Sequence, residues 1–245
     1  MKTRKILYFT FAFVVVALGL FLLMPKSTEQ QPLEDNPLQN EESGVINGHQ
    51  WVELGLSVKW ATCNVGAEKQ SDYGSYFAWG EVSPKDEYTW STYKYYRLSS
   101  YRNSFSKYVL DGKYGNVDNK RLLDLSDDAA RFNWGGSWRM PTFAESEELL
   151  NKCTWQWISM DGHNGYLITG PSGKSIFLPA SGSCIRSERH RVDSVCAYWT
   201  SKLYAYSTSS WAYHLSLKKE SYLSDPREIE TSDRFWGRSV RPVTE

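Results

Sequence analysis

Residues 133–150 read NWGGSWRMPTFAESEELL, and this stretch decides how the domain is built. Two tryptophans flank a Gly-Gly pair, whose backbone can adopt angles closed to other residues, so both indoles can approach distant chain segments closely. Thr142 lies three residues before Glu145, the spacing of a capping box, which predicts a helix start. The stretch therefore predicts an ordered aromatic loop that leads into a helix. The apolar side of this helix would carry Phe143, Leu149 and Leu150.

Short segments that alternate apolar and polar residues predict β-strands in the rest of the domain. One is HQWVELGLSVKWATCNV (49–65), which Gly55 divides, and another is SYFAWGEV (75–82). In GYLITGPSGKSIFLPA (165–180), the GPSG turn predicts a hairpin. No repeat of 20 to 50 residues is present, which argues against a solenoid or a propeller.

Two further segments carry specific expectations. LSDDAARFNW (125–134) predicts a short helix with Ser126 as its N-cap and acids in its first turn. SSWAYHLSL (209–217) predicts a strand with one face in the core and one outside. The core face would carry Trp211, Tyr213, Leu215 and Leu217, and the outer face Ala212, His214 and Ser216. Trp199 and Trp236 are also expected in the core.

The N-terminus predicts a membrane anchor. Lys2, Arg4 and Lys5 precede an apolar run over residues 6–24, and about 20 apolar residues are what an α-helix needs to cross a bilayer. A cleavable signal has a shorter apolar region and a small-residue exit, whereas this run ends in LLMPKS. We therefore favour an uncleaved transmembrane helix in residues 1–24 over a removed signal, with the basic flank in the cytoplasm and the rest exported.

Residues 25–45 contain three prolines and several acids but no aromatic residue, which predicts a flexible tether. Residues 46–245 contain all 11 tryptophans and are long enough for a single domain with a real core. The formal net charge is zero, so no general electrostatic argument favours nucleic acid as a partner. The aromatic content, with 16 tyrosines, is typical of exported binding modules.

Several stretches, in this order, carry a resemblance to a known family: WVELGLSVKWATCNVGA, DYGSYFAWGE, DDAARFNWGGSWRMPT, ELLNKCTW, GPSGKSIFLPASG and WGRSVRPV. Together they resemble the major paralogous domain first described in Fibrobacter succinogenes, which is abundant in exported proteins of Bacteroides-type bacteria. The resemblance runs from about residue 49 to residue 243. It implies an α+β fold of the C-type-lectin-like, formylglycine-generating-enzyme-like kind, loop-rich with short antiparallel strands and about two helices. It implies no reaction, because this fold hosts enzymes and binders alike.

Four cysteines lie in the exported part, and an even number there favours disulfides. Cys63 and Cys153 fall in family-like stretches, whereas Cys184 and Cys196 fall where the family pattern ends. On this resemblance we predict the pairs Cys63–Cys153 and Cys184–Cys196, with four free or buried thiols as the alternative.

The sequence favours binding over catalysis. The histidines accompany neither a Gly-x-Ser-x-Gly elbow nor a His-Glu-x-x-His zinc pair. Formylglycine-generating oxidases hold copper with two cysteines, but neither Cys184 nor Cys196 lies in a stretch that matches them. No cofactor is expected, although such folds often carry calcium, for which Asp124, Asp127 and Asp128 are the candidates.

Two regions are candidates for ligand contact. A loop closed by Cys184 and Cys196 would present a rigid basic surface suited to carboxylates, sulfates or phosphates. Its cations are Arg186, Arg189 and Arg191. In ligand-binding relatives of this fold, the last part of the chain presents the recognition surface. Carried over to this sequence, the contact candidates are Lys202, Tyr204, Tyr206, Tyr222, Arg227 and Arg234.

These features predict a membrane-anchored, exported ligand-binding or adhesion module without catalytic activity. Its partner would be a glycan or a protein of the cell envelope, since tyrosine and arginine serve both. The lipid bilayer would be contacted through residues 6–24, with the domain facing the periplasm or the cell exterior. The alternative is a structural or assembly component of the envelope. The third hypothesis is an enzyme related to the formylglycine-generating oxidases.

Overall fold

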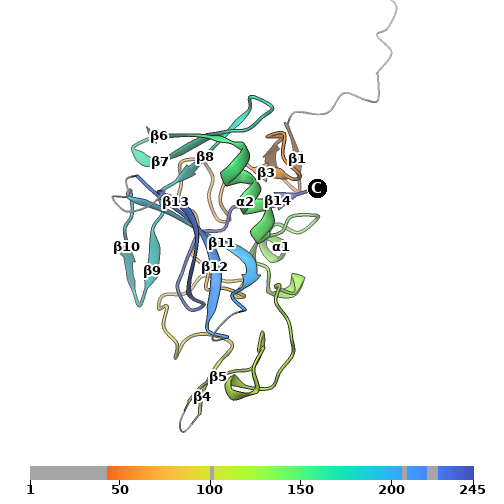
Figure 1. Cartoon of the computed structure of the whole chain (residues 1–245). Coiled ribbons are helices and arrows are strands. Elements are labelled where there is room, and N and C mark those ends of the chain that lie inside the picture. The colour runs from red at the N-terminus through yellow and green to blue at the C-terminus, as the bar shows by residue number, and fades with distance from the viewer. Residues whose placement is uncertain (1–42, 100–101, 206–208, 220–225) are drawn as a thin grey trace, which may run out of the picture. The chain divides into compact units, whose positions relative to one another are not determined.

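Short antiparallel strands, long ordered loops and two α-helices make up the part of the chain that the computed structural model describes, residues 43–99, 102–205, 209–219 and 226–245 (Figure 1). These residues belong to one compact unit of α+β character. The strand β1 begins at Ser43, before the predicted domain start at Ile46.

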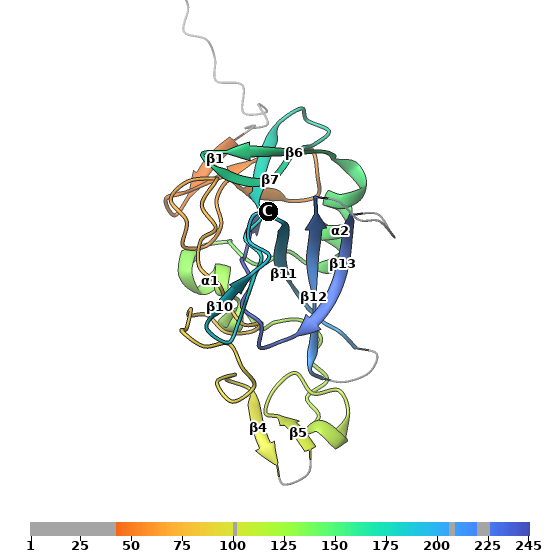
Figure 2. The same cartoon turned by 90° about the vertical axis from the view of Figure 1, so that its left-hand side faces the viewer.

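The strands are β1 (Ser43–Ile46), β2 (His49–Val52), β3 (Lys59–Ala61), β4 (Tyr96–Ser99), β5 (Arg102–Phe105), β6 (Thr154–Met160), β7 (His163–Thr169), β8 (Ser175–Pro179), β9 (Ser183–Ile185), β10 (Glu188–His190), β11 (Val195–Leu203), β12 (Trp211–Lys218), β13 (Arg227–Asp233) and β14 (Val243–Thr244). The helices are α1 (Ala129–Trp134) and α2 (Phe143–Lys152), with 3₁₀ turns η1 (Gly112–Tyr114) and η2 (Leu125–Asp127). The sheets have the strand orders β1-β2-β3-β14, β6-β7-β8 and β11-β12-β13, and β4–β5 and β9–β10 are separate hairpins. Both views place β4–β5 at the end of the domain opposite β6–β8 (Figure 2).

The Gly-Gly loop has the structure that its sequence predicts. Gly135 and Gly136 have φ angles of +66° and +57°, and a Cβ at Gly136 would lie 2.9 Å from the side chain of Asn47. This close approach lets Asn47 donate to the carbonyl of Trp134 and lets the indole of Trp138 donate to a carbonyl of β1. The loop therefore fastens the N-terminal hairpin β1–β2 to the core.

The predicted capping box of α2 is confirmed, since the Thr142 hydroxyl accepts from Glu145 N while the Glu145 carboxylate accepts from Thr142 N. The GPSG hairpin is also confirmed, between β7 and β8. The predicted N-cap of α1 is wrong. Asp128 caps this helix instead of Ser126, because residues 125–127 form a 3₁₀ turn. The predicted strand at 75–82 is wrong too, because only an isolated bridge forms there, from Phe77 to the C-terminal segment.

The middle strand β12 does not have one inner and one outer face. Leu215 and Leu217 are buried as predicted, but Ala212, His214 and Ser216 on the other face are buried as well. The reason is that β12 pairs with β11 and β13, and a separate core cluster covers each face of this sheet. Trp211, predicted to be in the core, is 39% exposed.

The C-terminal segment after β13 holds three buried arginines, which are 0%, 4% and 1% exposed: Arg234, Arg238 and Arg241. None forms an ion pair with a carboxylate in the described part of the chain. Their charge is instead solvated by backbone carbonyls, side-chain oxygens and aromatic faces, which are the alternatives that a guanidinium can use. Each arginine thereby joins the segment to loops far away in the sequence.

Arg241 shows the pattern most clearly. Its guanidinium donates to the Asn64 side chain at 2.8 Å and to the carbonyls of Ala61, Thr62 and Phe177. These acceptors come from β8 and from the end of β3, so one side chain connects two sheets. β14 then pairs with β3, which makes the C-terminal strand an edge strand of the N-terminal sheet.

No helix in the described ranges is long and apolar enough to cross a membrane. The predicted anchor over residues 6–24, and the tether up to residue 42, lie outside the described residues.

Replacing Arg241 with Met should lower the free energy of unfolding by ~3 kcal/mol or more, because each buried carbonyl left unpaired costs ~1–3 kcal/mol. Urea unfolding of the full-length chain in detergent, followed by tryptophan fluorescence, measures the loss. The control Arg186→Met changes an exposed guanidinium and should stay within ~0.5 kcal/mol of the wild type. Equal stabilities for both variants would contradict the assigned role of Arg241.

Candidate functional site

Helix α2 packs against all three strands of the sheet β11–β12–β13. It covers only part of the sheet face. Its first residue, Phe143, lies edge-on against Tyr213, with ring centroids 4.7 Å apart. Leu215 and Leu217, further along β12, are buried on the same face, whereas Trp211, before Tyr213, is exposed. The sheet face is therefore open beyond the N-terminal end of α2.

We call this exposed area the open-face patch. Its residues are Leu122, Phe143, Lys202, Tyr204, Trp211, Tyr213 and Asp233. Tyr204 contacts both Trp211 and Tyr213, with centroids 5.9 and 5.4 Å away. Leu122 is bridged to Lys202 and is 52% exposed. The patch thus presents partly exposed rings at one end of a rigid sheet.

The patch also carries one acidic and one basic group. The indole of Trp211 donates to Asp233 at 2.9 Å, which fixes the ring, and burial raises the pKa of the Asp233 carboxyl group. The ammonium of Lys202 lies 4.6 Å from the ring centroid of Phe143 and forms no ion pair with any described residue. A flat ring face flanked by a hydrogen-bond acceptor and a cation can hold a ligand by stacking and by polar contacts.

The structure brings together only some of the contact residues predicted for the C-terminal region. Lys202 and Tyr204 belong to the open-face patch, and Arg227 is half-buried at the start of β13. Tyr206 and Tyr222 lie outside the described residues.

The prediction that Arg234 contacts a ligand at the surface is wrong, because this residue is fully buried. Its guanidinium carbon lies 4.8 Å from the ring centroid of Phe105 and 5.2 Å from that of Trp79, and it donates to Tyr93 Oη and to backbone carbonyls. Its charge thus stabilises an aromatic cluster. Sequence reasoning also missed Trp211 and Asp233. The only available signal was the position of Trp211 at the start of a strand, directly after a polar loop.

The predicted basic loop is the hairpin β9–β10 together with the turn that follows it. Its three arginines have different contacts. The backbone of Arg186 pairs with Tyr88. The guanidinium of Arg189 stacks over Tyr76, 5.2 Å from its ring centroid. Arg191 lines a separate hollow with Lys218 and Lys219. Arg189 and Arg191 therefore line different hollows and do not form one anion-binding surface.

The four cysteines are free, so the predicted disulfides Cys63–Cys153 and Cys184–Cys196 are absent from the structure. Cys184 and Cys196 belong to different core clusters, and the Cys196 thiol donates to the carbonyl of Leu178. Burial raises the pKa of Cys153 to about 11 and also raises the pKa values of Cys184 and Cys196. These three thiols are therefore poor nucleophiles.

The acids proposed for calcium have other partners. Asp127 pairs with Lys94 and Lys107, and the Lys107 ammonium also pairs with Asp124. Asp128 accepts from three backbone N–H groups at the start of α1 and before α2. Within the described ranges, no three His, Cys, Asp or Glu side chains gather closely enough to hold a metal ion.

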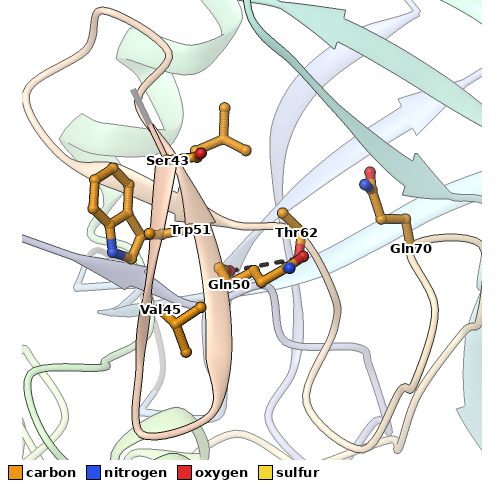
Figure 3. Close-up of a pocket in the computed structure, with 8 residues that line it drawn as sticks. Ser43, Val45, Gln50, Trp51, Thr62 and Gln70 are labelled. Carbon is orange, nitrogen blue, oxygen red and sulfur yellow. Dashed lines mark hydrogen bonds between the residues drawn. The ribbon is translucent and has the colours of Figure 1, made fainter. Parts of the chain in front are cut away.

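A second hollow, of about 320 Å³, lies beside the hairpin β1–β2 (Figure 3). All the residues that line it are uncharged, and they include Gln50, Thr62 and Gln70. The hydroxyl of Thr62 donates to the Gln50 carbonyl at 3.5 Å. The one aromatic residue of the lining, Trp51, is only 5% exposed, so this hollow offers no ring face for stacking and is the weaker candidate.

In comparisons with known proteins, no family model matches the chain, and no curated protein or solved structure matches it significantly.

We expect all four cysteines to be alkylated by iodoacetamide in urea without reductant, because none is paired. In the folded protein, Cys196 should react far more slowly than Cys63, since it is fully buried and its raised pKa leaves little thiolate. Peptide mass spectrometry of the labelled full-length chain measures both. Cysteine peptides that stay unlabelled in urea, joined in pairs that weigh two hydrogens less than two free thiols, would show that the disulfides exist.

The stability of the domain should fall in acid as Asp127 is protonated. Burial alone would raise the pKa of Asp127, but hydrogen bonds from Lys107, Tyr108 and Lys94 outweigh it and hold the pKa far below its usual range. The pKa of Asp127 in the folded domain is below the unfolded value of ~3.9. The stabilisation that ionised Asp127 contributes is therefore present above about pH 4 and is lost as the pH falls further.

Asp127→Asn should accordingly be less stable than the wild type at pH 7, with a difference that shrinks below about pH 4. Urea midpoints at several pH values measure this difference. The exposed Asp86→Asn serves as the control and should show a much smaller difference. A stability difference between Asp127→Asn and the wild type that stays constant down to pH 2 would contradict this role of the Asp127 carboxylate.

Proposed function

We propose that this protein is a membrane-anchored, exported binding module without catalytic activity, and that the open-face patch is its recognition surface. We further propose that its domain is of the C-type-lectin-like kind and belongs with the major paralogous domains. The observation that supports the binding role is the exposure of Trp211 on a sheet face where Leu215 and Leu217, further along the same strand, are buried.

The patch has the composition of a binding surface. Tyrosine and tryptophan provide large rigid contact areas at a low cost in conformational entropy, and they are enriched among residues that dominate binding energies. Asp233 and Lys202 add an acceptor and a donor beside the rings. A glycan would stack a sugar ring on Trp211 and hydrogen-bond to these two groups, so a glycan of the cell envelope is the first partner to test.

The exposed Leu122 supports the alternative, an assembly component of the envelope that binds a neighbouring protein. A protein partner would cover this leucine together with the rings, whereas a sugar would leave it exposed. The two partners therefore differ in how they respond to a change at Leu122.

Trp211→Ala should weaken ligand binding about 30-fold, which corresponds to the ~2 kcal/mol typical of an aromatic anchor. The full-length protein in detergent is screened on a glycan array and in a pull-down from envelope extracts, and each hit is titrated. The control Leu98→Ala removes an exposed apolar side chain from the separate hairpin β4–β5 and should leave binding unchanged. Leu122→Ala should weaken binding of a protein but not of a glycan.

Binding that is unaffected by Trp211→Ala would exclude the patch as the recognition surface. Turnover of a substrate in the absence of any saturable binding partner would exclude the binding role itself.

A further inference from the structure

A cationic hollow lies away from the open-face patch, between the turn after β10 and the end of β12. Its volume is about 330 Å³, and its lining is Arg191, Ser194, Val195, Lys218 and Lys219. Three of these five residues are cations and none is an acid. The hollow joins one of the predicted basic residues with two lysines that sequence analysis did not single out.

The positive charge around this hollow is not balanced. Lys218 pairs with Glu230 at 2.6 Å, but Arg191 and Lys219 form no ion pair with any residue in the described ranges. Arg238 is 4% exposed and close enough to Arg191 for their charges to repel, and its guanidinium contacts the Ser232 hydroxyl but no described carboxylate. Among these four cations, only Lys218 has a described carboxylate as its ion-pair partner, so positive charge is in excess around the hollow.

The electrostatics of Arg238 agree with this excess. The pKa of Arg238 is lowered to about 9, mainly by burial and in part by the charge of Arg191, while Glu230 acts to raise it. Like charges that repel one another in a partly desolvated position gain free energy from a bound anion.

The turn that carries Arg191 is fixed in place. Arg191 and Asp193 have φ angles of +58° each, and the carboxylate of Asp193 accepts from Tyr73 Oη and Asn164 N. Asp193 is thus held by Tyr73 and Asn164, and it forms no ion pair with Arg191 in the described ranges. The backbone of the turn is also held by hydrogen bonds from Ser194 N and Val195 N to the Arg191 carbonyl.

We propose that this hollow is a binding site for a divalent oxyanion, the phosphate monoester group of a ligand, which inorganic sulfate and phosphate mimic. The guanidinium of Arg191 supplies two parallel donors, which suit such a group, and the two lysines supply point charges. A divalent anion matches the charge excess better than a single carboxylate does. The site is independent of the open-face patch and does not rest on the function proposed for that patch.

The test is equilibrium dialysis of radiolabelled inorganic sulfate against the full-length protein in detergent, at constant ionic strength set with chloride. We expect saturable binding of one sulfate per chain. Arg191→Gln and Lys219→Gln should each weaken it tenfold or more. Arg186→Gln is the matched control, since it removes an exposed arginine of the same hairpin that does not line the hollow, and it should bind as the wild type does. Trp211→Ala should also leave sulfate binding unchanged.

Phosphate should displace sulfate at similar concentrations, and acetate should not. Absence of saturable binding would overturn the proposal, and so would equal binding by the Arg191→Gln and Arg186→Gln variants. Displacement by acetate as effective as by phosphate would overturn the preference for a divalent group.

Discussion

The buried arginines of the C-terminal segment are the interaction on which the rest of the domain depends. Arg234, Arg238 and Arg241 are placed where water is excluded, yet no described carboxylate contacts any of them. A buried guanidinium is tolerated only if its N–H groups have partners, and here backbone carbonyls and ring faces provide them. Since those partners belong to loops far away in the sequence, each arginine holds several irregular segments in one arrangement. This explains how long loops can be ordered with little regular secondary structure.

The same constraint positions the two candidate binding surfaces. Arg234 and Arg238 flank the sheet β11–β12–β13, one among the aromatic rings at one end and the other against Trp199 and Trp236. The helix α2 then covers the face that carries Leu215 and Leu217, and it begins at Phe143, beside Tyr213. The open-face patch therefore lies beyond the N-terminal end of α2, where the sheet face is open. The cationic hollow lies where charges that stabilise the core come close to the surface.

Local signals predicted the local structure well. The capping box of Thr142 and Glu145, the GPSG turn and the permissive Gly-Gly pair each act within a few residues, and all three are formed as predicted. The predictions that failed concern long-range neighbours. Ser126 lost the capping role to Asp128, which also accepts from Met140 N, a contact that only the folded chain provides. The alternation along β12 could not show that a second core cluster would cover its other face.

The sequence by itself determined that the domain is a loop-rich α+β unit with a helix at residues 143–152, because capping, turn chemistry and strand alternation depend on neighbours in the chain. Only the tertiary structure decided which polar residues face water. Arg234 and Arg191 have the same side chain, but Arg234 is enclosed by aromatic rings and Arg191 lines a hollow together with two lysines. The difference depends on which distant segments pack beside each arginine. Burial and charge balance are properties of those packed surroundings, which no local pattern encodes.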